Sequence, residues 1–284
     1  MKKLLFVLVI VGLCFIPAFS EFSLKATGGL TYITAGDLNK AFQSANDHIN
    51  LYATSHSGSF PTVHTGLNFS AELLYNLNEN ISLGLGIGYF RVPIVFDVSF
   101  NYGTPTNQTD TVSAIAIPIT LNLHYSFPIR PSLKVFLTAG AGYYLAKFNF
   151  EVNYIWDYGV SGKETMDYIF KSSSGAFGLQ GGVGVEYQIS SGLSLIVEVL
   201  GRYAKVSNFK GDWTSVDKFN GTTSSGQGSD VYFNYFEYDV NGKRYSDLHF
   251  GEDLPARAIN VRRGNLDLTG FSTLIGIKYS FGKI

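Results

Sequence analysis

The chain has 284 residues, 15% of them charged and 15% aromatic, and its formal net charge is −1. It has no excess of basic residues to hold nucleic acid through its phosphates, so we expect no nucleic-acid partner. The length fits one domain, because all-β folds commonly reach this size without division.

The first 20 residues have the pattern of a cleaved signal peptide. Two lysines follow Met1, an apolar run extends from Leu4 to Pro17, and the small residues Ala18 and Ser20 precede Glu21. The apolar run is shorter than the roughly 20 residues that a membrane-spanning helix needs. We therefore predict export, with residues 1–20 removed and residues 21–284 forming the folded domain.

The chain offers little for metal, redox or cofactor chemistry. Its one cysteine, Cys14, lies in the predicted signal peptide, so the mature chain is expected to have no thiol and no disulfide. His48, His56 and His64 follow no spacing that would bring them to one metal ion. We expect neither a metal nor a cofactor.

Beyond residue 20 no apolar run is long enough for a membrane helix, and the chain instead alternates with a period of two. In the third such segment Leu83, Leu85 and Ile87 share one face and Gly84 and Gly86 the other. This alternation predicts strands between two unlike environments. The predicted strands are Phe22–Thr34, Val63–Leu77, Ile81–Phe90 with an extension toward Phe100, Val112–Phe127 with a bulge at Pro118, Leu133–Ala146, Gly175–Ile189, Leu193–Val206 and Leu268–Phe281.

The links between these segments alternate between short and long. Asn78–Asn80, Pro128–Ser132 and Ser190–Gly192 are short, whereas the link from Ser207 to about Asn265 is the longest. Short turns on one side and long loops on the other are typical of a bacterial outer-membrane β-barrel. Because the number of strands is even, both chain ends return to the side of the short turns.

Two of the long links have a pattern of their own. Asp37 is expected to cap a helix in which Leu38, Phe42, Ala45, Ile49 and Tyr52 share one face. Asn241-Gly242 predicts a tight hairpin between Val231–Val240 and Lys243–Asp247. If both arms joined the barrel it would have ten strands, but their charged residues make a poor lipid face. We predict eight strands with the hairpin outside the membrane, and keep ten as the alternative.

The last segment carries a further signal. Phe271, Ile275, Ile277, Tyr279 and Phe281 alternate along it. Its ending, with Gly276, Tyr279 and Phe281, resembles the C-terminal assembly signal of bacterial outer-membrane β-barrels.

The mature chain as a whole resembles the small OmpA/OmpX/OmpW-type outer-membrane proteins. The resemblance implies an all-β, membrane-spanning, antiparallel up-and-down barrel in the bacterial outer membrane. It also implies outer-membrane lipid and lipopolysaccharide as partners, and contact with the barrel-assembly machinery through Gly276, Tyr279 and Phe281.

The inward face of the predicted strands gathers ionisable residues near the short turns. These residues are Lys25, Glu72, His124, Lys134, Glu186, Glu198 and Lys278, with Arg202 one step farther out. We expect a structural charge layer that closes the lumen, centred on Glu72, Glu198, Arg202 and Lys278, because isolated charges would be costly to bury. Farther out, the same face is rich in glycine, as at Gly84 and Gly140, and predicts a pocket open to the outside.

These patterns indicate a non-enzymatic barrel with a structural or surface-binding role through its long extracellular loops, where an unidentified ligand binds. One alternative is a narrow OmpW-like pore for small or hydrophobic solutes. Another is a lipid A deacylase, because His124-Tyr-Ser126 resembles the His-x-Ser pair of those barrels. That pair lies beside a short turn rather than at the outer leaflet, and Phe127 replaces the asparagine of that family. We expect no catalytic residues.

Overall fold

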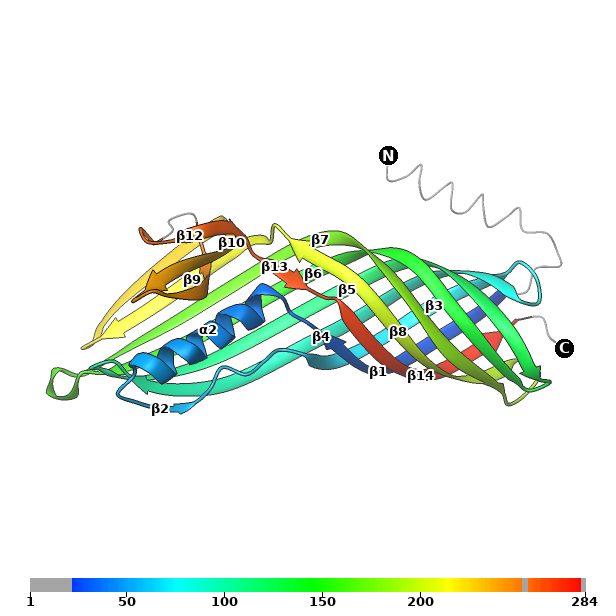
Figure 1. The fold of residues 1–284 in the computed structure, drawn as a ribbon, viewed down its shortest axis with the longest axis horizontal. Coiled ribbons are helices and arrows are strands. Elements are labelled where there is room, and N and C mark those ends of the chain that lie inside the picture. Colours follow the sequence, from blue (N-terminus) through cyan, green and yellow to red (C-terminus); the bar gives the residue numbers. More distant parts are fainter. Residues whose placement is uncertain (1–21, 252–254, 282–284) are drawn as a thin grey trace.

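The computed structural model describes residues 22–251 and 255–281, so the predicted signal peptide lies outside the described residues. In this part of the chain, 14 strands form one sheet beside one long helix (Figure 1). The helix α2 is Asp37–Tyr52, and a short 3-10 helix is Gly159–Ser161. The strands are β1 (Phe22–Ile33), β2 (Ser55–Gly58), β3 (Thr65–Asn76), β4 (Ile81–Asn101), β5 (Pro105–Arg130), β6 (Leu133–Asp157), β7 (Lys163–Gln188), β8 (Leu193–Ser207), β9 (Lys210–Phe219), β10 (Thr222–Val240), β11 (Lys243–Phe250), β12 (Ile259–Arg263), β13 (Asn265–Asp267) and β14 (Gly270–Ser280).

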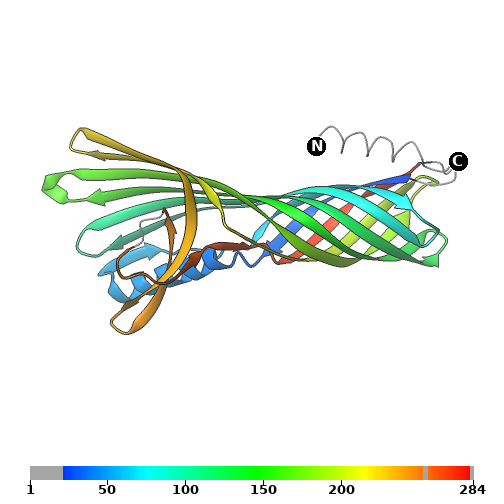
Figure 2. The same cartoon turned by 90° about the horizontal axis from the view of Figure 1, so that it is seen from above.

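Eight of these strands pair in a closed antiparallel ring, which gives an all-β, barrel-like fold (Figure 2). The order around this strand ring is β1, β3, β4, β5, β6, β7, β8, β14 and back to β1. Each predicted segment overlaps one of the eight strands. The ring is closed between β7 and β8 only from Gly178 to Gln188, and beyond that β7 pairs with β9 instead.

Several strands run much farther than predicted, and residues 101–111 and 147–174, which fall between the predicted strands, are largely strand. The alternation continues through them, but the apolar residues now lie on the inward face and the polar residues on the outward face. In β6, Leu137 and Leu145 are exposed, whereas farther along Phe148 and Val152 are buried and Lys147 points outward. The exchange is expected where water replaces lipid outside the wall, since polar side chains then face outward and apolar ones fill the interior.

The predicted bulge at Pro118 is absent. Pro118 pairs with Tyr144 of β6, and the register of β5 and β6 is the same on both sides of it. Its ring lies against Gly88 of β4, where an added Cβ would come within 2.9 Å of the proline Cγ. A glycine on the neighbouring strand therefore leaves room for the proline without an extra residue.

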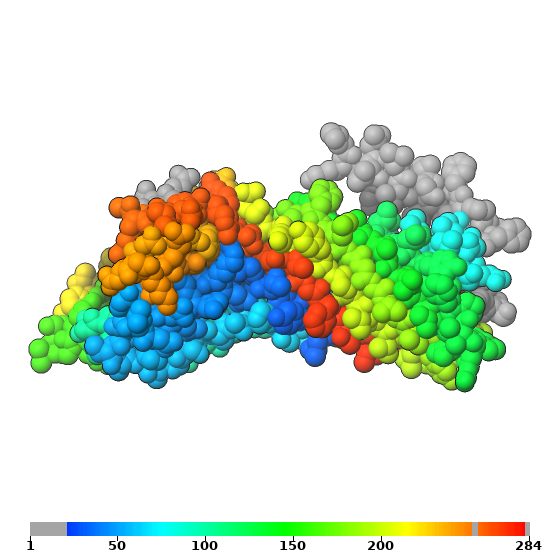
Figure 3. Space-filling model, viewed as in Figure 1, coloured from blue at the N-terminus to red at the C-terminus, as the bar shows by residue number. Residues whose placement is uncertain are grey.

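The predicted helix is confirmed, but Asp37 does not cap it. The residue before the helix is Gly36, with φ 57°, and Asp37 is the first helical residue. Leu38, Phe42 and Ile49 bury the apolar face of α2 against the extended parts of β4–β7, called the extended wall below. The space-filling view shows α2 beside the β10–β11 hairpin at the end of the molecule away from the short turns (Figure 3). Neither helix in the described residues is long and apolar enough to cross a membrane.

The predicted hairpin is also confirmed. Val240 pairs with Lys243, and Asn241 and Gly242 have φ angles of 51° and 80°, as a type I′ turn requires. In the described residues, β10 pairs with β9, β11 and β12, none of which belongs to the strand ring. The two arms of the hairpin therefore add no strand to it.

Candidate functional site

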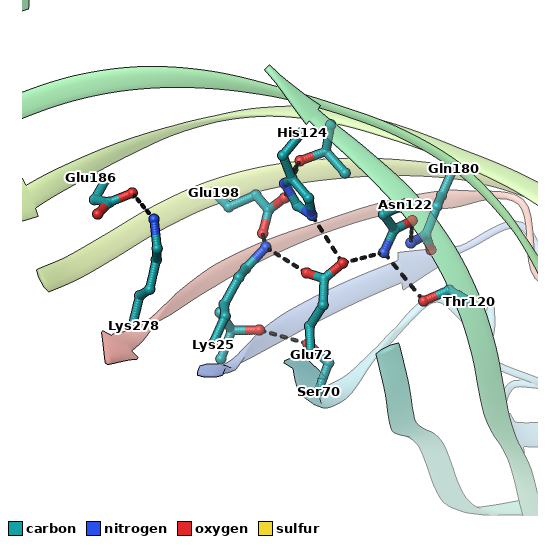
Figure 4. A network of polar contacts seen from close by, with 12 residues as sticks. Lys25, Ser70, Glu72, Thr120, Asn122, His124, Gln180, Glu186, Glu198 and Lys278 are labelled. Carbon is teal, nitrogen blue, oxygen red and sulfur yellow. Dashed lines mark hydrogen bonds and ion pairs between the residues drawn. The ribbon is translucent and has the colours of Figure 1, made fainter. Parts of the chain in front are cut away.

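Four strands of the ring each place one ionisable side chain at the same level of the lumen (Figure 4). Lys25 Nζ lies 2.7 Å from Glu198 Oε2 and 3.4 Å from Glu72 Oε2. His124 Nε2 lies 2.9 Å from Glu72 Oε1. All four side chains are buried. They come together because each is on the inward face of its strand, at matching heights of the antiparallel register.

A threonine links two members of this group. The Thr138 hydroxyl donates to Glu198 Oε1 at 3.2 Å and lies 3.0 Å from His124 Nδ1. Lys25, Glu72, His124 and Glu198 thus form one buried, hydrogen-bonded cluster of ionisable side chains, called the charge layer below.

Uncharged polar residues extend the charge layer outward. Asn122 donates to Glu72 Oε1 at 2.7 Å, Gln180 donates to Asn122 at 2.7 Å, and Tyr144 donates to Gln180 at 3.2 Å. The sequence reading missed these residues and Thr138, because it followed ionisable groups only. Their inward positions in predicted strands could have signalled them.

Among the described residues, most of the space that the glycines were predicted to leave open farther out is filled. A Cβ added at Gly84 would overlap the Glu72 carboxylate, and one at Gly140 would overlap Asn122. The glycines therefore make room for larger side chains on neighbouring strands. What remains among these residues is a cavity of about 40 Å³, which holds a few water molecules at most.

The remaining predicted residues lie on either side of the charge layer. Lys278 Nζ pairs with Glu186 Oε2 at 2.8 Å, and Lys134 is the register partner of Glu186 on β6. All three line an open hollow of about 490 Å³ among the short turns. Lys278 therefore belongs to a second ion pair and not to the centre of the network.

Arg202 makes its contacts outside the charge layer, although the predicted network included it. Its Nε donates to Leu268 O at 2.8 Å and its Nη2 to Thr31 Oγ1 at 3.1 Å. Its guanidinium lies over the ring of Phe90, 4.3 Å from the centroid. Arg202 thus stands one level farther out, beside a buried apolar core that includes Phe90, Tyr144 and Leu268. This core fills the interior beyond the charge layer.

The geometry offers no support for the His-x-Ser reaction. Both ring nitrogens of His124 are engaged, one by Glu72 and the other by Thr138, and neither contacts Ser126. Within residues 22–251 and 255–281, no three His, Cys, Asp or Glu side chains gather as metal ligands would.

Comparison with known structures returns outer-membrane proteins of low sequence identity. OprG from Pseudomonas aeruginosa is 11% identical, over 92% of this chain and 96% of its own, with a TM-score of 0.37. A major outer membrane protein from Thermus thermophilus is 14% identical, over 92% and 99%, with a TM-score of 0.39. The outer membrane protease OmpT from Escherichia coli is 12% identical, over 92% and 96%, with a TM-score of 0.33.

No curated protein matches the sequence. The family model for the outer membrane protein beta-barrel domain matches residues 6–243, which is most of the chain. The chain therefore belongs to the outer membrane protein β-barrel family and is a protein of the bacterial outer membrane.

Proposed function

We propose that the chain is an eight-stranded, membrane-spanning up-and-down barrel with a closed lumen. In this proposal the protein presents an extracellular binding surface, and it neither conducts solutes nor catalyses a reaction. The observation that carries this proposal is the charge layer of Lys25, Glu72, His124 and Glu198, followed outward by the apolar core. A barrel of about eight strands has an interior that side chains can just fill.

The OmpW-like pore is the weaker alternative because a path through the lumen would have to cross both layers. Separating one partner from a buried ion pair costs about 3–5 kcal/mol. The apolar core would also have to admit water around Phe90 and Tyr144, which are fully buried. Among the described residues, the cavity beside Glu72 has a volume of only about 40 Å³.

The outer surface of the strand ring supports its place in lipid. Large apolar side chains point outward around it, including Leu85, Leu121, Leu179 and Ile275, each more than half exposed. Outward-facing apolar residues are expected only where hydrocarbon surrounds the wall. Lipid and lipopolysaccharide would contact this face. Tyr279 and Phe281 at the end of β14 are half exposed and remain our proposed contact with the assembly machinery.

Planar-bilayer recording of the refolded protein tests the closed lumen. We expect no steady conductance from the wild type, because the charge layer and the apolar core both block it. Heat-modifiable migration in gels and protection from protease in liposomes establish that the protein has inserted. Stable open-channel currents from inserted wild-type protein would refute the proposal in favour of the pore.

A further inference from the structure

A second cavity, separate from the one beside Glu72, lies where β4–β7 extend beyond the closed part of the strand ring. It has a volume of about 410 Å³ and lies between α2, the extended parts of β4–β7 and the β10–β11 hairpin. Its lining is rich in aromatic residues, including Phe42, Tyr102, Phe150, Tyr154, Tyr168 and Tyr238. Its volume is within the range of small-molecule sites, roughly 300–1,000 Å³.

Two carboxylates line the same cavity, one from the wall and one from the hairpin. Asp110 of β5 is fully buried, and Gln108 Nε2 donates to both of its oxygens at 2.9 Å. Asp247 of β11 accepts the backbone N–H of Leu248 at 2.7 Å. Both negative charges contribute, after burial, to raising the pKa of Tyr154, so they act on one region of the cavity.

The two carboxylates have no basic partner in the described residues, unlike Glu72, Glu198 and Asp37. Burial raises the pKa of Asp110 to about 7. The Asp247 side chain is exposed. His48 lines the cavity, but burial and the charge of Arg257 lower its pKa, so it supplies no positive charge at pH 7. Arg257 lies over the ring of Tyr238 at 5.8 Å and forms an ion pair with neither carboxylate.

We propose that this cavity binds a small organic cation, an ammonium group attached to an apolar or aromatic body. The ammonium would supply the positive charge that Asp110 and Asp247 lack, and the tyrosine faces would attract it further. The apolar body would pack on Phe42 and Phe150. A calcium ion is a poorer fit, because it takes six to eight oxygen ligands and the lining has only two carboxylates. The proposal rests on the extracellular binding role proposed above.

Isothermal titration calorimetry of the refolded protein in detergent tests the proposed cation site with two probes. Benzylamine is a cation at pH 7.5, and benzyl alcohol is a neutral molecule with the same ring. We expect benzylamine to bind at one site at least tenfold more tightly than benzyl alcohol. Asp110→Asn and Asp247→Asn should each weaken benzylamine binding at least fivefold and leave that of benzyl alcohol unchanged. Asp239→Asn is the matched control, because Asp239 is exposed on the same hairpin and pairs with Arg244.

The absence of benzylamine binding, equal affinity for the two probes, or full benzylamine affinity in both variants would overturn the proposal. Calcium that displaces benzylamine and depends on both aspartates would replace it with a metal site. The comparison of probes on the wild type decides the matter even if a variant does not fold. None of these results depends on bilayer conductance, so failure of this proposal and of the closed lumen can be told apart.

Discussion

Buried charges in this protein are stabilised in two different ways. Lys25 and His124 face carboxylates in the charge layer. Arg202, equally buried, has a backbone carbonyl, a hydroxyl and the face of Phe90 instead. Guanidinium suits such a place, because it is planar, weakly hydrated and able to donate in several directions while it stacks.

Arg202→Ala should therefore destabilise the fold by about 2–3 kcal/mol, since hydrogen bonds to a charged group and packing on Phe90 are both lost. Arg244→Ala is the control, because Arg244 is half exposed and its pairs with Glu237 and Asp239 are worth at most about 1 kcal/mol. Urea unfolding of the refolded proteins, followed by tryptophan fluorescence, measures both. Equal losses would show that Arg202 is an ordinary lumen residue.

The first residue of helix α2, Asp37, is bound by residues near the C-terminal end of the chain. The Asp37 carboxylate is fully buried and accepts hydrogen bonds from Arg262 and from the backbone and side-chain nitrogens of Asn265, the latter two at 2.9 Å. Arg262 also lies over Tyr235, 4.2 Å from the ring centroid. Asp37 thus joins the helix to β12 and β13, which a local cap would not do.

Asp37→Ala should free the start of α2 from β12 and β13 and leave the strand ring intact. Removal of one partner from a buried pair costs about 3–5 kcal/mol, and less is expected here because Arg262 is partly exposed. Hydrogen exchange should become faster in α2 and remain unchanged in β14. Asp47→Ala, near the other end of the helix in a half-exposed pair with Lys243, is the control. Unchanged exchange in α2, or loss of the heat-modifiable band, would contradict this role for Asp37.

The whole molecule has two ends of different character. At one end the ring strands are joined by short turns, such as residues 77–80, where Glu79 is exposed. At the other end the β6–β7 hairpin runs far beyond the closed part of the ring, and Val160 at its tip is fully exposed (Figure 2). Family membership places the protein in the outer membrane, and we propose that the long end faces outward.

Single cysteines test this orientation, since the one native cysteine lies in the predicted signal peptide. In intact cells, a membrane-impermeant maleimide should label Val160→Cys and should not label Glu79→Cys. Both should react once the envelope is broken. Labelling of Glu79→Cys alone in intact cells would reverse the orientation.

By itself, the sequence determined which residues lie on opposite faces of the strands, because a period of two follows from backbone geometry alone. The helix and the Asn241-Gly242 turn could also be predicted, because their signals lie within a few neighbouring residues. The lengths of β5, β6 and β7 could not be predicted, because the period of two is the same whether lipid or water lies outside the strand. Apolar residues switch from the outward face at Leu145 to the inward face at Phe148, and this switch marks the boundary between the two surroundings. It can be recognised only when several strands show it.

Only the tertiary structure decided which inward residues meet. Lys25, Glu72 and Glu198 came together because three distant strands hold them at one height. Arg202 and Asp37 found partners on segments more than 60 and 200 residues away along the chain. The cavity of Asp110 and Asp247 likewise exists only where wall, helix and hairpin converge. Such contacts depend on strand register and on packing across the interior, and the local order of residues specifies neither.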